Sequence, residues 1–79
     1  MPLIFKYKGF KIRFYMNEES RMHVHAVYEN GGEIKVWLSP EIEVAKITGN
    51  FSDTIINQIL KEIKDKEREC KNAWNKYHR

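Results

Sequence analysis

Hydrophobic and polar residues alternate through the first half of the chain, and this alternation predicts antiparallel strands. Residues 3–7 and 10–16 form two such runs on either side of Gly9, and the apolar positions of the second run are separated by Lys11 and Arg13. A period of two is the period of a β-strand. The two runs therefore predict a hairpin with its turn at Gly9.

The same alternation continues in the middle of the chain. Residues 22–28 and 33–38 alternate again, and residues 30–32, Asn-Gly-Gly, supply the positive φ angles that a tight hairpin turn requires. Ser39-Pro40 ends the strand predicted at residues 33–38, because proline has no N–H to donate to a neighbouring strand. Residues 42–47 then predict a fifth short strand.

The last third of the chain has helical periodicity. Ser52 is the expected N-cap, Asp53 suits the first turn, and the helix is expected to continue to about Tyr77. Its apolar stripe consists of Ile56, Ile59, Leu60, Ile63, Cys70, Ala73, Trp74 and Tyr77. The predicted fold class is α+β, a four- to five-stranded antiparallel β-meander packed on one C-terminal amphipathic helix, with residues 1–79 as a single domain.

Length and composition predict a small single-domain protein of a reducing compartment. A chain of 79 residues buries only about 60% of its unfolded surface, so one core fills it. The single cysteine, Cys70, cannot form an internal disulfide, which favours the reducing cytoplasm. No apolar run is long enough to cross a membrane, so we expect no membrane association. No cofactor motif is present apart from a candidate divalent-metal pair among the histidines.

The positive charge is concentrated at the start of the chain. Residues 1–17 hold four basic residues and no acid, whereas residues 18–79 hold ten basic and eleven acidic residues. Such asymmetry favours an anionic partner.

Strand alternation also predicts which side chains share a face. The apolar set should face the helix: Leu3, Phe5, Tyr7, Phe10, Ile12, Phe14, Met16, Val24, Ala26, Tyr28, Ile34, Val36 and Leu38. The open face should then carry Lys6, Lys11, Arg13, Tyr15, His23, His25, Lys35 and Trp37, with Ile4 and Val27 as its aliphatic residues. This second set is basic and aromatic.

Three uses of such a face stay open. It could bury Trp37 against a protein partner or a second copy of the chain. It could also hold single-stranded RNA or DNA, because bases stack on rings while cations neutralise phosphates. A solvated face with no ligand is the third reading.

His23 and His25 lie two residues apart, which places both rings on one face with α-carbons about 6.6 Å apart. They are candidate metal ligands, but zinc catalysis commonly needs a third protein ligand. Candidates for that ligand are Glu18, Glu19, Glu29, Glu33 and His78.

The same pair could also serve in catalysis. In this reading His23 and His25 exchange protons while Arg13 or Lys11 holds a phosphate, as in metal-independent RNA cleavage. Ordinary polar residues on a half-exposed strand are the third reading.

Several short motifs resemble one known family. They are M-P-L-I at 1–4, H-V-H at 23–25, E-I-K-V-W-L-S-P at 33–40, G-N-F-S at 49–52 and A-W-N-K-Y at 73–77. Together they resemble DUF4160, a small bacterial family of unknown function. The resemblance implies a member of a two-protein arrangement similar to a toxin–antitoxin pair. It also marks the residues to test, which are His23, His25, Lys35, Trp37 and Trp74.

The sequence thus favours a small bacterial binding module that meets a partner through its open basic and aromatic face, rather than an enzyme. The alternative is a toxin-like ribonuclease that uses His23 and His25 with Arg13. A metal-binding protein using the same histidine pair is the third hypothesis.

Overall fold

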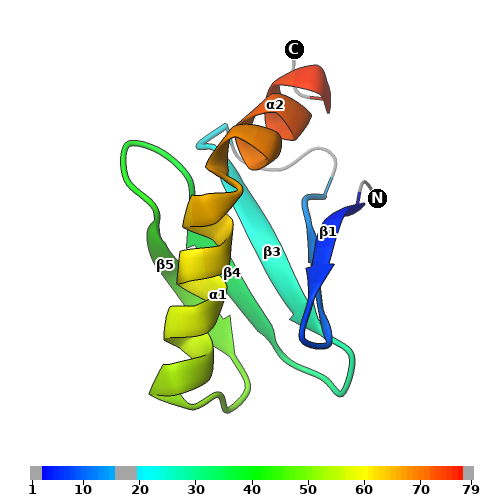
Figure 1. The fold of residues 1–79 in the computed structure, drawn as a ribbon, viewed down its shortest axis with the longest axis vertical. Helices are drawn as coiled ribbons and strands as arrows, with labels where there is room; N and C mark the ends of the chain where they lie inside the picture. Colours follow the sequence, from blue (N-terminus) through cyan, green and yellow to red (C-terminus); the bar gives the residue numbers. More distant parts are fainter. Residues whose placement is uncertain (1–2, 16–19, 78–79) are drawn as a thin grey trace.

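The computed structural model describes residues 3–15 and 20–77, and within them the chain forms a five-stranded antiparallel sheet (Figure 1). The strands are β1 (Leu3–Tyr7), β2 (Phe10–Arg13), β3 (His23–Tyr28), β4 (Glu33–Trp37) and β5 (Glu43–Thr48). Their order in the sheet is β1-β2-β3-β4-β5, so each strand pairs with its neighbours in sequence. The predicted meander is confirmed, including its fifth strand.

The hairpin turns lie where the sequence predicted them. Gly9 has a φ of 81°, and Gly31 and Gly32 have φ values of 103° and 97°. Positive φ is strained for residues with a side chain, so glycine suits these positions. At the second turn the Tyr28 N–H donates to the Gly32 carbonyl oxygen at 3.0 Å, which closes the loop between β3 and β4.

Two helices follow the sheet, α1 (Asp53–Asp65) and α2 (Glu67–Tyr77). The predicted start is confirmed, because the Ser52 hydroxyl accepts a hydrogen bond from the Ile55 N–H at 3.2 Å. The prediction of one continuous helix is wrong. The helix is interrupted at Lys66, whose backbone angles are φ −110° and ψ 25°. No glycine or proline marks this position, so the local sequence carries no ordinary signal for the break.

In Figure 1, α1 lies across one face of the sheet and α2 continues towards the end of the sheet where β3 begins. The core fills the layer between the helices and the strands. The buried cluster consists of Phe10, Ile12, Val24, Ala26, Ile34, Val36, Leu38, Ile59, Ile63 and Cys70. Phe14 is also fully buried and contacts the rings of Trp74 and Tyr77 on α2. Strand alternation therefore directs Phe10, Ile12 and Phe14 beneath the helices, as predicted.

The edge strand β1 departs from simple alternation. Its pairing with β2 is irregular between Leu3 and Phe5, where a β-bulge shifts the register. As a result Ile4 packs against the core and Leu3 is 45% exposed opposite Arg13. We expected the reverse orientation of these two side chains. Met16, also expected inside, lies outside the described residues.

Candidate functional site

The face of the sheet opposite α1 is built by cross-strand pairs. Side chains that are directly opposite in an antiparallel sheet point to the same face. The register forms three rows on this face: Lys6, Lys11, Val27, Glu33 and Thr48; Leu3, Arg13, His25, Lys35 and Lys46; and His23, Trp37 and Glu43. The predicted candidates from Lys6 to Trp37 therefore share one side of the sheet, and the ring of Tyr15 lies 4.3 Å from that of His25.

This open face is predominantly basic. Its strand residues include the cations Lys6, Lys11, Arg13, Lys35 and Lys46 and the carboxylates Glu33 and Glu43. Lys46 was not among the sequence candidates. Its orientation depends on the irregular pairing of β4 with β5 between Lys35 and Val36, and simple alternation does not reveal such a shift.

His25 lies at the centre of a polar cluster on this face. Its Nδ1 lies 2.7 Å from Oε2 of Glu33, and the Tyr15 hydroxyl donates to Oε1 of the same carboxylate at 3.3 Å. A carboxylate accepts hydrogen bonds, so Nδ1 of His25 carries the proton in this pair. Glu33 therefore fixes the orientation of the His25 ring, as a carboxylate does for many catalytic and metal-binding histidines.

His23 is held at the end of β3. Its Nδ1 donates to the backbone carbonyl oxygen of Arg21 at 2.7 Å. Ring centroids of His25, Trp37 and Trp74 lie 5.0, 5.6 and 5.0 Å from the His23 ring. Trp74, which the resemblance marked for testing, thus contacts the histidine pair through His23.

The expected exposure of the two histidines is wrong. His23 is 0% exposed and His25 is 4% exposed, although both occupy the predicted positions on the face. Alternation specifies the side of the sheet, but it does not reveal neighbours that come from distant segments. Here α2 brings Trp74 against His23, and Tyr15 lies against His25.

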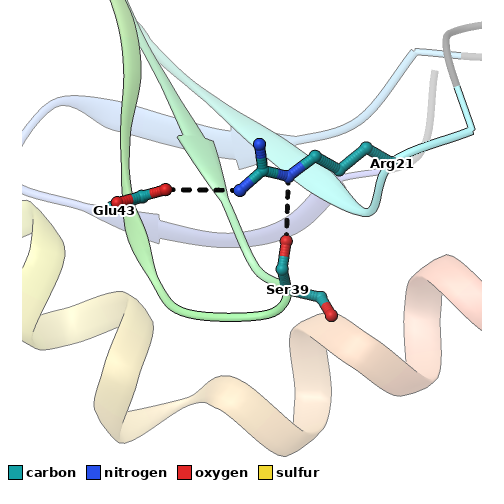
Figure 2. A network of polar contacts seen from close by, with 3 residues as sticks. All are labelled: Arg21, Ser39 and Glu43. Atoms are coloured by element: carbon teal, nitrogen blue, oxygen red, sulfur yellow. Dashed lines mark hydrogen bonds and ion pairs between the residues drawn. The ribbon is translucent and has the colours of Figure 1, made fainter.

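Trp37 is half-buried and lies beside two cations. The Arg21 guanidinium carbon is 4.2 Å from the indole centroid, and the Lys35 ammonium is 4.6 Å from it. Arg21 also donates from Nε to the Ser39 carbonyl oxygen at 2.9 Å and from Nη2 to Glu43 at 3.2 Å (Figure 2). Sequence reasoning missed Arg21 because it lies in the polar segment before β3.

The metal hypothesis gains no third ligand from the residues described. Across residues 3–15 and 20–77 no group of three or more histidine, cysteine, aspartate or glutamate side chains is placed to hold a metal ion. Glu33, one expected ligand, instead accepts from His25. Of the other candidates, Glu29 lies in the turn after β3, and Glu18, Glu19 and His78 lie outside the described residues.

Cys70 is buried in the core, as its place on the helical stripe predicted. Burial, together with the nearby charges of Glu69 and Glu67, raises the pKa of its thiol to about 12. The thiolate is the reactive form, so the folded protein holds almost none of it at neutral pH.

We therefore expect Cys70 to resist alkylation by iodoacetamide at pH 8 in the native protein and to react fully in urea. Mass spectrometry of timed samples measures both rates. With a pKa of about 12, the thiolate is only about one part in ten thousand at pH 8, so native labelling should stay slow from pH 7 to pH 9. Rapid native labelling at pH 8 would contradict the buried position.

The comparison with known proteins adds a family but no activity. The family model for the domain of unknown function DUF4160 matches residues 9–75, which include both histidines, Trp37 and Trp74. No curated protein and no solved structure matches the chain. Neither helix of the described chain is long and apolar enough to cross a membrane. Because the family model spans most of its length, the chain belongs to the DUF4160 family.

Proposed function

We propose that this protein is an interaction module whose open sheet face binds an acidic surface of a partner protein, as one member of a two-protein pair similar to a toxin–antitoxin system. The observation that carries the proposal is the alignment of Lys6, Lys11, Arg13, Lys35 and Lys46 on one side of the sheet. A surface of this sign steers a negatively charged partner and raises the association rate.

The surroundings of the rings favour a protein partner over single-stranded nucleic acid. Binding of single strands relies on bases stacking against accessible aromatic rings. On this face His23 and His25 are buried, and Trp37 already lies against Arg21 and Lys35. The ammonium groups of Lys6, Lys11 and Lys46 are exposed on this face, and they suit the carboxylates of an acidic protein surface.

Burial also favours binding over catalysis. A ribonuclease that uses His23 and His25 needs a substrate within hydrogen-bond distance of the imidazoles. Both rings are buried, and each Nδ1 is engaged with the protein itself, one with the Arg21 carbonyl and one with Glu33. In this proposal the two histidines have a structural role, because their hydrogen bonds hold side chains and backbone together at the centre of the binding face.

The test is a binding measurement with two matched triple variants. The ligand is the protein encoded by the adjacent gene, co-purified first and then titrated by surface plasmon resonance. One variant reverses exposed charges on the sheet face, K6E, K11E and K46E. The control reverses three exposed lysines on the helices, K61E, K64E and K76E. Both variants change the net charge equally, so a difference between them locates the interface.

We expect the sheet-face variant to lower the association rate constant about tenfold or more, and the helix variant to change it much less. Added salt should reduce the wild-type rate towards that of the sheet-face variant, because screening removes the same attraction. Equal losses in both variants, or no binding by the wild type, would reject the proposal. An oligonucleotide that binds more tightly than the protein would move the function to nucleic acid.

A further inference from the structure

Arg13 differs from the other cations of the open face in its surroundings. It is half-buried on β2 between Leu3 and His25, and its Nε is fully inaccessible to solvent. Among the described residues, this Nε is the one buried side-chain nitrogen or oxygen without a hydrogen-bond partner. A buried donor on a charged group is costly to leave unpaired, so a position of this kind needs a physical explanation.

The charged residues that share the open face of β1 and β2 with Arg13 are lysines, and Glu29, in the turn after β3, lines the same surface hollow as those lysines. Lys11 precedes it by two residues on β2 and is paired with Lys6 on β1, and both lysines are exposed. The two carboxylates of the face, Glu33 and Glu43, belong to β4 and β5. Within the described residues, the open face of β1 and β2 therefore carries three cations and no acid of its own.

This arrangement has the chemistry of an oxyanion site. A guanidinium group presents several N–H donors in a planar fork that matches two oxygens of one anion. Ammonium groups nearby add charge without demanding a fixed geometry. Three positive groups balance a doubly charged phosphate better than a singly charged carboxylate, which one arginine would neutralise.

We propose that Arg13, with Lys11 and Lys6, binds the phosphate group of a small phosphate monoester. Because Nε is inaccessible to solvent, the anion accepts from the terminal Nη groups of the guanidinium and lies over the β1–β2 hairpin, beside the strand that carries His25. This site shares Arg13, Lys11 and Lys6 with the protein interface proposed above, but it does not rest on that proposal. Each can be disproved without the other, because phosphate binding is measured on the protein alone.

The experiment is an NMR titration of the ¹⁵N-labelled protein that follows the Nε–Hε signal of Arg13. Inorganic phosphate is the probe, with sodium acetate and sodium chloride at equal ionic strength as the other arms. We expect phosphate to produce a saturable shift of the Arg13 signal, and acetate and chloride to produce small shifts that do not saturate. Glycerol 3-phosphate should act like inorganic phosphate, because it offers the same dianion.

Variants assign the effect to the site. R13Q should weaken phosphate binding about tenfold or more, since charge-assisted hydrogen bonds are lost. In that variant the backbone signals of Lys11 report the titration. R13K, which keeps the charge and is less disruptive, should bind more weakly than wild type because it lacks the planar fork. K61Q, which removes an exposed cation from α1, is the matched control and should keep wild-type affinity.

Four results would overturn the proposal. They are an equal response to acetate, a phosphate shift that never saturates, wild-type phosphate affinity in R13Q, and binding of an oligonucleotide phosphodiester without binding of the monoester. Native backbone spectra of R13K and K61Q guard against loss of the fold as the cause of weaker binding.

Discussion

Replacing Trp74 by alanine should destabilise the protein by about 3–5 kcal/mol, the largest loss we expect from a single core substitution. Trp74 is only 5% exposed and lies between Phe14, at 5.9 Å between ring centroids, and His23, at 5.0 Å. Removing the indole opens a cavity beneath α2 and uncovers the buried His23. Urea denaturation followed by circular dichroism gives the change in the free energy of unfolding.

Tyr77 provides the matched control on the same helix. It also contacts Phe14, at 5.6 Å, but its side chain is 45% exposed. Y77A should therefore cost only about 0.5–1.5 kcal/mol, the usual value of one aromatic pair. W74F retains an aromatic ring and should fall between the two if W74A does not fold. A loss in W74A no larger than that in Y77A would show that α2 does not hold the histidine end of the sheet.

Replacing Gly32 by alanine should cost about 3–5 kcal/mol, from backbone strain together with a steric clash. Its φ is 97°, and a Cβ at this position would lie 2.7 Å from Cζ of Phe51 and 2.9 Å from the Thr48 carbonyl oxygen. The backbone carbonyl cannot rotate away as a flexible side chain can. Phe51 is fixed by its ring contacts with Phe10 and Tyr28.

Gly31 is the adjacent control for this substitution. Its φ of 103° imposes a similar backbone penalty, but a Cβ there would meet no atom within 4 Å. G31A should therefore lose only the strain component, about 1–3 kcal/mol. The difference between the two variants in urea denaturation isolates the packing of the turn against Phe51. Equal losses would mean that the loop between β5 and α1 does not pack on the turn between β3 and β4.

The sequence predicted the strands and their inner face well because both follow from local rules. Alternation of Phe10, Ile12 and Phe14 with Lys11 and Arg13 fixes two faces of a strand, and burial of the apolar set selects the inner one. The turn glycines and the Ser52 cap are equally local, since each depends on the chemistry of a few neighbouring residues. These features appear in the structure where they were expected.

Side-chain orientations predicted by simple alternation were wrong or incomplete where the pairing of two strands shifts its register. A bulge in β1 exchanges the expected orientations of Leu3 and Ile4, and a shift between Lys35 and Val36 places Lys46 on the open face. One extra residue in a strand reverses the side chains that follow it relative to the partner strand. The break at Lys66 between the two helices likewise has no counterpart in the local sequence pattern.

The amino-acid order alone determines the β-meander, its helical cover, the grouping of the candidate residues on one side of the sheet and the membership of Cys70 in the core. The tertiary structure decides how those candidates meet. It buries His23 against Trp74, pairs His25 with Glu33, places Arg21 on Trp37 and leaves Nε of Arg13 without an acceptor. Local patterns specify the direction of a side chain, whereas its neighbours come from segments far apart in sequence and are fixed only when the whole chain packs.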